Sequence, residues 1–491
     1  MWFPLILGLL STIYYYIIRN RDFFLRKNVP FVKSAPLFGT SWKAIFGFES
    51  YFAYYRRIYQ KFPENKFFGV FELLQPVFVI RDPALYRKIF ITNFDHFMNR
   101  RLMVDREVDP VGGLLIGVVR NEEWRRLRNI TSPAFTANKL KFILTLVNGT
   151  MKRINEDLGQ KITKKGNFRF EAIDFYTRCA TDLIAHTTFG LNVNSINEEN
   201  NEFYLMGKKL TDFTKKFFWR ATLLTALPKV AKFLEVALFD KEATKYFQGI
   251  IREIVEFRQK NDVKIPNFIQ LFMEADLSFD EIVSVSTAFF FGGIDSFATL
   301  WQFMSYELAM NPEVQEKLQE EIDSVANDLK NPEEIDYEAI KKLIFMDAVI
   351  EETFRKHPST AWLERVCNKS FTLREKTESE EEVVLNPGDI VVIPNDAIQN
   401  DPKIFEDPDK FQPERFLEKK ISGEIMPFGL GPRQCIATRF ALMQTKVFFF
   451  NLLSKFTIKK NEETVEEFNL VKGTMLRKVE GGILLDFVKR N

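Results

Sequence analysis

The sequence predicts a mainly α-helical protein with smaller β-sheets, an α+β fold, in which one large domain follows an N-terminal membrane anchor. Apolar residues recur at helical spacing over most of the chain, and short β-rich apolar runs bounded by turn residues interrupt them. No repeat, low-complexity block or change of composition divides residues 30–491, so a single domain is expected despite the length. A chain of 491 residues can bury a large core.

Composition narrows the functional classes. Lys and Arg number 68 against 66 Asp and Glu, a net charge of +2, which gives no reason to expect a nucleic-acid partner. The three cysteines form neither a disulfide framework nor a zinc pattern, as is typical of a reducing compartment, and three histidines argue against a His-rich metal site. The 52 phenylalanines either fill the core or line an aromatic substrate pocket, and the sequence leaves both interpretations open.

The first element is an apolar segment at the N-terminus. Trp2 to Ile18 carries no charge over 17 residues, and Arg19 and Arg21 follow at once. Roughly 17–25 apolar residues cross a bilayer as a helix. Because no basic residue precedes the segment and no small-residue cleavage site follows it, we expect residues 1–18 to be an uncleaved transmembrane signal anchor. The positive-inside rule then places the rest of the chain in the cytosol.

A hinge is expected next. Residues 19–36 are basic at their start and contain Pro30 and Pro36, so they cannot continue a helix and suit a stiff connection. The single large domain is then expected to occupy residues 37–491.

Within that domain, three segments have the apolar runs and turns of strands, and one has the pattern of a long helix. The strand segments are Val70–Ile80, Val383–Pro394 and Gly473–Val488. The helix is expected to begin at Ser278, which opens a Ser-x-x-Glu capping box, and to end near Met310.

A second apolar patch, Phe217 to Leu227, is flanked by lysines on both sides. It either dips into a lipid surface or packs against another helix, and the sequence does not decide between the two.

Cys435 ends the most informative stretch of the chain, Phe428-Gly429-Leu430-Gly431-Pro432-Arg433-Gln434-Cys435. The glycines and the proline suit a tight turn whose N–H groups face the sulfur, and a helix is expected from Ile436. The helix dipole and Arg433 are both expected to lower the pKa of the thiol, which makes Cys435 a candidate metal ligand or nucleophile. A buried structural cysteine is the plainer alternative.

This stretch resembles the haem-binding loop of the cytochrome P-450 superfamily, whose pattern is Phe-x-x-Gly-x-Arg-x-Cys-x-Gly. The sequence matches every position but the last, where Ala437 stands in place of glycine. The resemblance implies a cytochrome P-450 fold and haem b (iron protoporphyrin IX), with Cys435 as the axial thiolate ligand that favours O–O cleavage. It also implies that Phe428 shields the sulfur and that amides of the turn donate to it.

A second motif, Gly292-Gly293-Ile294-Asp295-Ser296, lies in the middle of the long predicted helix. Glycine costs about 1 kcal/mol relative to alanine there, so the pair either allows close helix packing or loosens the helix for a small ligand. The motif resembles the superfamily's oxygen-activation sequence Ala/Gly-Gly-x-Asp/Glu-Thr, which implies that Asp295 and Ser296 relay protons. Serine lacks the methyl group that fixes threonine's rotamer, so we expect less controlled proton delivery and more peroxide leakage.

Glu352 and Arg355 alone would form only an i,i+3 ion pair on a helix. Their order and spacing relative to Arg415 and Cys435 match the superfamily's Glu-x-x-Arg helix and Pro-Glu-Arg-Phe segment. The resemblance implies that Glu352, Arg355 and Arg415 form a buried charge network that braces the haem loop and specifies the fold.

Basic residues are expected to bind the haem propionates. Trp124 and Arg128 match the superfamily's Trp-x-x-x-Arg propionate helix, with a solvated basic face as the alternative. Arg100, Arg365 and Arg433 fit the same role because buried carboxylates need cationic partners.

Other cations on the cysteine side are expected to form a docking face for an acidic reductase, or else an ordinary solvated surface. They are Arg125, Arg126, Lys410, Lys419, Lys420 and Arg439.

Together these motifs imply a microsomal haem-thiolate monooxygenase of the xenobiotic-oxidising type that resembles insect detoxification members. Such an enzyme inserts one oxygen atom from O₂ into an apolar small molecule, xenobiotic or endogenous. Its NADPH electrons come through NADPH–cytochrome P-450 reductase, with cytochrome b5 as a further candidate partner. The expected location is the endoplasmic reticulum membrane, with the catalytic domain facing the cytosol.

The substrate pocket is expected to be lined by segments that vary among such proteins, so the substrate itself cannot be read. The lining is residues 99–118, residues 204–227, Phe289, Phe290, Phe291, Gly292 and Gly293.

Two alternatives remain at this point. A haem-thiolate isomerase or dehydratase would act on hydroperoxides without a reductase, and Asp295, Ser296 and the basic face argue against it. A cofactor-free cysteine hydrolase would need a partner such as His or Asn around Cys435, and none is evident.

Overall fold

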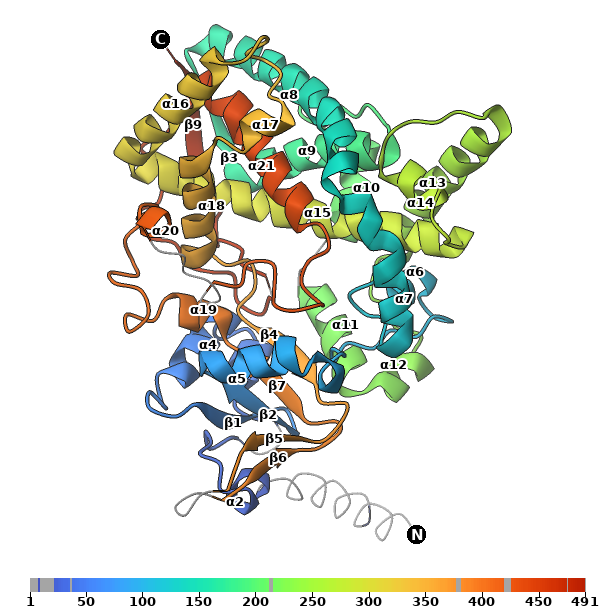
Figure 1. Cartoon of the computed structure of the whole chain (residues 1–491), viewed down its shortest axis with the longest axis vertical. Helices are drawn as coiled ribbons and strands as arrows, with labels where there is room; N and C mark the ends of the chain where they lie inside the picture. The colour runs from blue at the N-terminus through green and yellow to red at the C-terminus, as the bar shows by residue number, and fades with distance from the viewer. Residues whose placement is uncertain are drawn as a thin grey trace.

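The computed structural model describes residue 8 and residues 22–35, 38–211, 215–376, 381–418, 425–474 and 476–490. Long helices fill one end of the molecule, and two of the three small sheets lie toward the other, so the predicted mainly α fold with small sheets is confirmed (Figure 1). The helices of nine or more residues are α4 (Tyr51–Tyr59), α7 (Asn121–Thr131), α8 (Ala137–Lys165), α9 (Ala172–Ile184), α10 (Glu202–Leu210), α11 (Lys215–Ala226), α13 (Lys241–Asn261), α15 (Phe279–Met310), α16 (Pro312–Asn327), α18 (Ile344–Lys356) and α21 (Thr438–Leu453).

Short helices connect these elements. The α-helices among them are α2 (Phe23–Arg26), α3 (Trp42–Ile45), α5 (Pro83–Arg87), α6 (Pro110–Leu114), α12 (Pro228–Phe233), α14 (Phe268–Met273), α17 (Tyr337–Ile340), α19 (Asn395–Gln399) and α20 (Arg415–Glu418). Single turns of other helix types are η1 (Lys88–Thr92), η2 (Phe94–His96), η3 (Ser132–Phe135) and η4 (Ala185–Phe189).

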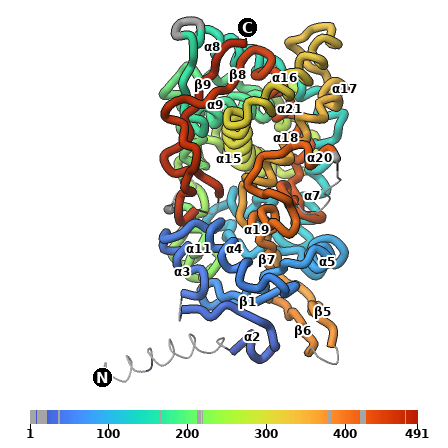
Figure 2. The backbone as a smooth tube through the Cα atoms, turned by 90° about the vertical axis from the view of Figure 1, so that its left-hand side faces the viewer, coloured from blue at the N-terminus to red at the C-terminus, as the bar shows by residue number. Residues whose placement is uncertain are grey.

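The strands form three small sheets. Their bounds are β1 (Phe67–Glu72), β2 (Gln75–Ile80), β3 (Asn167–Glu171), β4 (Leu363–Val366), β5 (Phe371–Arg374), β6 (Val383–Leu385), β7 (Ile390–Ile393), β8 (Phe456–Lys459) and β9 (Leu484–Lys489). The first sheet has the order β1-β2-β7-β4, in which only β2 and β7 are parallel. The others are β3-β9-β8 and the hairpin β5-β6, and Figure 2 shows that hairpin at the same end of the molecule as α2.

Two of the predicted strand segments are confirmed as paired strands and the third only in part. Residues 70–80 span the turn of the β1-β2 hairpin, and residues 383–394 contain β6 and β7. In residues 473–488 the only strand among the described residues is the start of β9, which begins at Leu484.

The long helix α15 crosses the centre of the molecule (Figure 1). Ser278 and Glu281 form the predicted capping box, and the helix ends at Met310, as predicted. The helix is continuous through Gly292 and Gly293, so of the two alternatives for this pair the structure favours close helix packing over a loosened helix. The reason is packing at one of the two glycines: a Cβ at Gly293 would overlap the side chain of Ile184 on α9, so this glycine allows the two helices to approach closely.

The core is largely aromatic. One hydrophobic cluster runs through the helical part around α15, and further clusters lie on the sheet β1-β2-β7-β4. Many phenylalanines have no exposed surface, among them Phe68, Phe78, Phe247, Phe303 and Phe448. Core filling therefore accounts for much of the phenylalanine content.

The segment predicted as a hinge is packed onto the domain where it is described. Phe24, on α2, is fully buried and its ring contacts those of Phe71 and Phe78 in the sheet. Phe31 bridges to Gly69 of β1. The described part of the expected hinge, residues 22–35, is thus packed against the domain, because Phe24 and Phe31 both join the apolar cluster on the sheet.

The predicted membrane anchor, residues 1–18, lies outside the described residues apart from Gly8. Among the described residues, one helix is long and apolar enough to cross a membrane, and it is α15. In its apolar window 61% of the residues are buried inside the protein, which is the behaviour of a central core helix.

Candidate functional site

The loop before α21 holds Cys435 in a turn that only glycine can make. Gly429 and Gly431 have φ of +82° and +72°, and a Cβ at Gly431 would overlap the carbonyl of Phe90. The Cys435 amide donates to the carbonyl of Phe428 over 2.7 Å, which closes the turn. The Phe428 ring packs edge-on against Phe354 of α18, with 5.1 Å between the ring centroids. The loop is thus fixed to η1 on one side and to α18 on the other.

Cys435 has exposed surface, but protein atoms surround it closely enough to remove much of the water around its thiol. Burial raises the pKa of this thiol. The Ala437 amide, Arg128 and Arg100 each pull the pKa downward in part. The sequence-based expectation of a thiol pKa lowered by Arg433 is therefore wrong, because Arg433 turns away and desolvation outweighs the remaining cations. A positively charged ligand ion would stabilise the thiolate in this setting.

Arg433 fastens the Cys435 loop to the segment that precedes α7. Its guanidinium donates to the carbonyls of Met98 (2.8 Å), Ile116 (3.2 Å) and Val119 (2.6 Å). The same group lies 4.5 Å from the centroid of the Trp124 ring. Both residues are buried, so Trp124 and Arg433 form a stacked pair that organises this wall of the site.

Five arginines gather beside the Cys435 loop, and burial lowers the pKa of each, while neighbouring arginines lower the pKa further in Arg128, Arg365 and Arg433. Burial and the positive charge of neighbouring arginines, Arg100 first among them, lower the pKa of Arg433 to about 9. Burial lowers the pKa of Arg365 well below its usual range, and Arg100 and Arg433 add to this. Burial also lowers the pKa of Arg100, Arg128 and Arg120. Because like charges that are held together away from water repel one another, the binding of an anion among these arginines is favoured.

The carboxylate beside this arginine cluster, that of Glu364, already has a cationic partner. Glu364 accepts hydrogen bonds from Arg101, which also pairs with Glu72 at 2.5 Å. The Nε atoms of Arg365 and Arg120 are buried without a hydrogen-bond partner among the described residues. These donors and the uncompensated charge suit a ligand that carries carboxylates, such as the two propionates of haem. Arg120 was not found from the sequence, and its place one turn before Trp124 was the only available signal.

One face of α15 is open in the middle of an otherwise buried helix. Gly292 and Ser296, four residues apart and therefore on one face, are both exposed. A Cβ at Gly292 would meet no other atom within 4 Å. Cys435 thus provides an exposed sulfur donor, and α15 leaves room for a ligand beside Gly292, and both features suit a haem protein.

The three consecutive phenylalanines of α15 point in three directions. Phe289 packs against Phe135, Phe268 and Phe440. Phe291 contacts Phe239 at 4.6 Å between centroids. Phe290 is fully buried among Phe189, Phe203 and Phe247. The assignment of Phe290 to the substrate pocket is corrected, because Phe290 lies about 200° around the helix from Gly292 and belongs to the core.

Glu352, Arg355 and Arg415 form the predicted buried network. Arg355 donates to both carboxylate oxygens of Glu352 (2.7 and 2.9 Å), and both side chains are fully buried. Arg415 donates to the same carboxylate over 3.2 Å. Arg355 also donates to the carbonyl of Gln399 on α19.

Gln399 connects this network to the Cys435 loop. Its side-chain oxygen accepts from the amide of Met426 (3.0 Å), and its amide nitrogen donates to the carbonyl of Phe354 (2.9 Å). The fully buried Gln399 is a bracing residue that the sequence did not indicate, because nothing local distinguishes it from any other glutamine.

Asp295 and Ser296 are adjacent on α15 but face different surroundings. The Asp295 side chain is 13% exposed and forms an ion pair of 3.4 Å with Lys478. Burial raises the pKa of Asp295, and Lys478 offsets part of this rise. Ser296 lies on the open face with Gly292.

Three of the four described cations that were proposed as a reductase-docking face already have acidic partners. Arg125 pairs with Asp95 and Glu122, and Arg126 pairs with Glu281. Lys410 pairs with Asp407 at 2.6 Å, whereas Arg439 is exposed. Lys419 and Lys420 lie outside the described residues.

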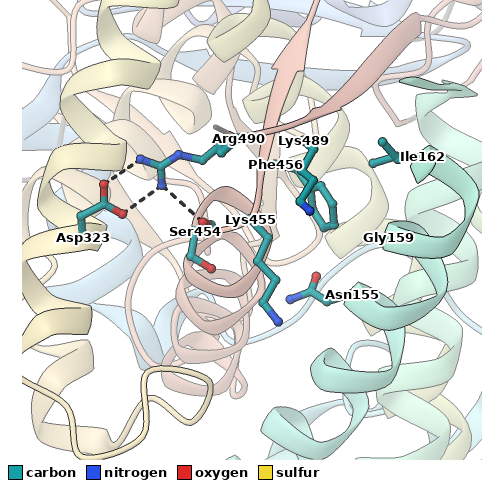
Figure 3. Close-up of a pocket in the computed structure, with 9 residues that line it drawn as sticks. All are labelled: Asn155, Gly159, Ile162, Asp323, Ser454, Lys455, Phe456, Lys489 and Arg490. Atoms are coloured by element: carbon teal, nitrogen blue, oxygen red, sulfur yellow. Dashed lines mark hydrogen bonds and ion pairs between the residues drawn. The ribbon is translucent and has the colours of Figure 1, made fainter. Parts of the chain in front are cut away.

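A separate cavity of about 540 Å³ lies at the far end of α21, between α8, α16 and the strands β8 and β9. Figure 3 shows Arg490 there reaching Asp323, and the pair is 2.6 Å apart. None of the residues lining this cavity belongs to the Cys435 loop, so the cavity is not part of this site.

The donor set indicates the class of protein. Within the described chain, no group of three or more His, Cys, Asp or Glu could hold a metal ion by itself. A single thiol beside buried arginines fits a cofactor that brings its own metal ligands and its own carboxylates, which is the site of a haem-thiolate protein.

Comparison with known proteins agrees with this class. Residues 29–485 match the family model Cytochrome P450. The chain is 32% identical to Cytochrome P450 9e2 of Blattella germanica, over 96% of this chain and 94% of that protein. It is 33% identical to Probable cytochrome P450 9f2 of Drosophila melanogaster, over 96% of both, and 31% identical to Cytochrome P450 3A9 of Rattus norvegicus, over 100% and 97%.

The chain therefore belongs to the cytochrome P450 family, and the resemblance found in the sequence is confirmed. The protein is an oxidoreductase of the monooxygenase type, with haem b as its cofactor and NADPH as the electron source through a reductase.

Proposed function

We propose that this protein is a microsomal monooxygenase that inserts one oxygen atom from O₂ into apolar small molecules, including xenobiotics. The observation that carries the proposal is the accessible Cys435 thiol in its glycine turn, next to a cluster of buried arginines. When bound, haem supplies a redox-active iron whose cysteine ligand favours O–O cleavage. The similarity to insect and mammalian members of the family supports the substrate class.

Each residue around the site has a proposed part in holding the cofactor. Cys435 is the metal ligand, and Phe428 shields its sulfur from water. Arg100, Arg128 and Arg365 bind the propionates, because their guanidinium groups lie in the cluster and are short of anions.

The remaining two residues predicted to bind the cofactor act differently in this proposal. Trp124 and Arg433 hold the wall of the site in place, because the ring of one covers the guanidinium of the other and that guanidinium is engaged by three carbonyls.

Asp295 and Ser296 are proposed to move protons. Ser296 lies on the open face of α15, where its hydroxyl can donate to dioxygen, and Asp295 on the neighbouring face can resupply the proton. Gly292 leaves room for the substrate on this face, while Phe289 and Phe291 border it and Gly293 serves the contact with α9.

Membrane attachment is proposed at two places. Residues 1–18 form the anchor in the endoplasmic reticulum membrane, and the catalytic domain faces the cytosol. The second place is an exposed apolar surface on α11, α12 and the N-terminal region. It comprises Phe46, Phe48, Trp219, Leu227, Val230, Phe233 and Leu234. The rings of Phe46 and Trp219 are 6.0 Å apart, so the two parts of this surface are continuous.

Electrons are proposed to arrive from NADPH–cytochrome P450 reductase, with cytochrome b5 as a second donor. The docking face is centred on Arg439, which is exposed and lies one turn after Cys435. The paired cations Arg125, Arg126 and Lys410 contribute less, because their charge is already compensated.

The decisive experiment is the spectrum of the reduced protein with carbon monoxide. A thiolate ligand shifts the Soret band strongly to the red, and Cys435→Ser should abolish that shift while Cys367→Ser, a buried cysteine in the sheet region, should keep it. Retention of the band in Cys435→Ser would overturn the ligand assignment.

The alternatives are less well supported. A hydroperoxide isomerase would turn over without NADPH, so NADPH-dependent product formation from an apolar substrate separates it from a monooxygenase. A cysteine hydrolase would need a base near Cys435. All three histidines of the chain are engaged elsewhere: His96 with Ser370, His186 with Thr150 and His357 with Glu307.

A further inference from the structure

Asp295 of α15 has a partner that is remote in sequence. The carboxylate lies 3.4 Å from the ammonium group of Lys478, and the two side chains are 13% and 29% exposed. An ion pair that is mostly shielded from water is stronger than one on the surface. The pair therefore links the helix that carries the proposed proton relay to the C-terminal segment of the chain.

The position of Lys478 is fixed by a hydrogen bond of its own backbone and by the contacts of its neighbour Arg477. The Lys478 carbonyl accepts from the amide of Val471 (2.8 Å). The two residues lie in a segment that we call residues 470–482, of which 470–474 and 476–482 are described, and a bridge between Leu470 and Val479 pairs its two ends. Arg477 next to it donates to the carbonyl of Pro358 (2.9 Å) and pairs with Asp396 of α19. Because consecutive side chains of an extended segment point to opposite sides, fixing Arg477 toward α19 directs Lys478 toward α15.

Three acidic groups on α15 itself and on elements packed against it pair with other partners. Asp182 of α9 pairs with Arg153, and Glu352 of α18 pairs with Arg355. Glu307, farther along α15 itself, pairs with Lys356 and His357. Within the described residues, Lys478 is thus the cation whose field acts on Asp295.

We propose that Lys478 is a positioning residue for the proton relay: its ammonium holds the Asp295 carboxylate ionised and turned toward residues 470–482, so the strength of this pair controls the proton supply to Ser296. The inference rests on the proposed function, because it gives a regulating partner to the acid of that relay.

The electrostatic consequence has a definite direction. Burial raises the pKa of Asp295 and Lys478 lowers it, so removal of the lysine charge raises this pKa further. Asp295 then remains protonated up to a higher pH than in the unaltered protein. A charge-conserving change, Lys478→Arg, should leave the titration nearly in place.

Infrared spectroscopy of the resting holoenzyme tests this without turnover. The C=O stretch of the protonated carboxyl group, assigned by its loss in Asp295→Asn, is followed as a function of pH. In Lys478→Gln its midpoint should move upward by roughly one pH unit, the lower end of the effect of an opposite charge, since the pair is partly exposed. Lys472→Gln, an exposed lysine in the same 470–482 segment, is the matched control and should not move it.

A second measurement connects the pair to the reaction. Product formed per NADPH consumed is recorded against pH, and its profile should move with the infrared midpoint in Lys478→Gln. In the Asp295→Asn background, Lys478→Gln should have no further effect. An unmoved infrared midpoint overturns the proposal, and so does a moved midpoint with an unchanged coupling profile. In both cases an intact carbon monoxide spectrum and NADPH-dependent product leave the monooxygenase assignment standing.

Discussion

Gly431 lies so close to the carbonyl of Phe90 that a side chain at Gly431 would overlap that oxygen. Its φ of +72° adds a second reason for glycine. Gly431→Ala should therefore lower stability by about 2–4 kcal/mol, from backbone strain and overpacking together. The measurement is the melting temperature of the holoenzyme with the fraction that keeps the thiolate carbon monoxide band. Gly429→Ala, where φ is +82° but a Cβ would make only an ordinary contact of 3.7 Å with the Cα of Gln434, should show the smaller loss, which comes from strain alone.

Removal of the Glu352 charge should destabilise the folded protein strongly. Glu352→Gln leaves Arg355 and Arg415 buried without their counter-charge, which typically costs about 3–5 kcal/mol. We expect protein that retains little haem, measured as haem per polypeptide after purification. The matched control is Glu338→Gln, which breaks an exposed i,i+3 pair with Lys341 and should change little. Equal haem content in both variants would contradict the bracing role.

Ser296 should control coupling. Ser296→Ala should lower product per NADPH and raise peroxide, because a positioned proton donor contributes about 10²–10⁴ to the step it serves. Ser296→Thr should restore or improve coupling, since the added methyl fixes the rotamer of the hydroxyl. Ser286→Ala, a buried serine earlier on the same helix, serves as the control. Unchanged coupling in Ser296→Ala would remove this residue from the relay.

We expect residues 1–18 to act only in membrane attachment, whereas α2 contributes to the stability of the domain. Removal of residues 1–18 should release much of the protein from membranes and leave the carbon monoxide spectrum intact. Phe24→Ala should cost about 3–5 kcal/mol, because a fully buried ring is lost, whereas Leu25→Ala on the same short helix, 67% exposed, should be nearly neutral. Melting temperatures of the truncated and substituted proteins test both statements. Complete release by the truncation would show that the apolar surface at Phe46 and Trp219 adds little.

Acid should destabilise the protein through His357. Burial lowers the pKa of this histidine to about 4, against an ordinary value of 6.5. The folded state therefore holds it neutral, and its contribution to stability is complete above pH 6.5 and is lost as the pH falls toward 4. Up to about 3 kcal/mol should disappear over this interval. Melting temperature against pH measures the slope, and His357→Gln should flatten it; an unchanged slope would show that other groups dominate.

The features that could be predicted from the sequence are those that depend on short-range patterns of residues. The capping box at Ser278 fixes the start of α15, and the order of Glu352, Arg355, Arg415 and Cys435 identified both the buried network and the thiol loop. These features depend on residue types at set spacing, which a single chain displays directly.

The remaining features depend on contacts between distant segments. The pairing of Lys478 with Asp295 and the role of Gln399 have no local pattern. The pKa of Cys435 rises because of burial, which helix position and one neighbouring arginine could not reveal. Three consecutive phenylalanines must point three ways, but only the packing of neighbouring helices shows that Phe290 is the one directed into the core.

Because of the arginine cluster beside Cys435, binding of the cofactor should stabilise the folded state. Five guanidinium groups, buried at Arg365 and Arg433 and half-buried in the other three, are held together in the native state and are solvated in the unfolded chain. A dianionic ligand that binds only the native state therefore shifts the folding equilibrium by mass action, by about 4 kcal/mol at a thousand times its Kd. We therefore expect the yield of folded protein to rise with the supply of haem during synthesis.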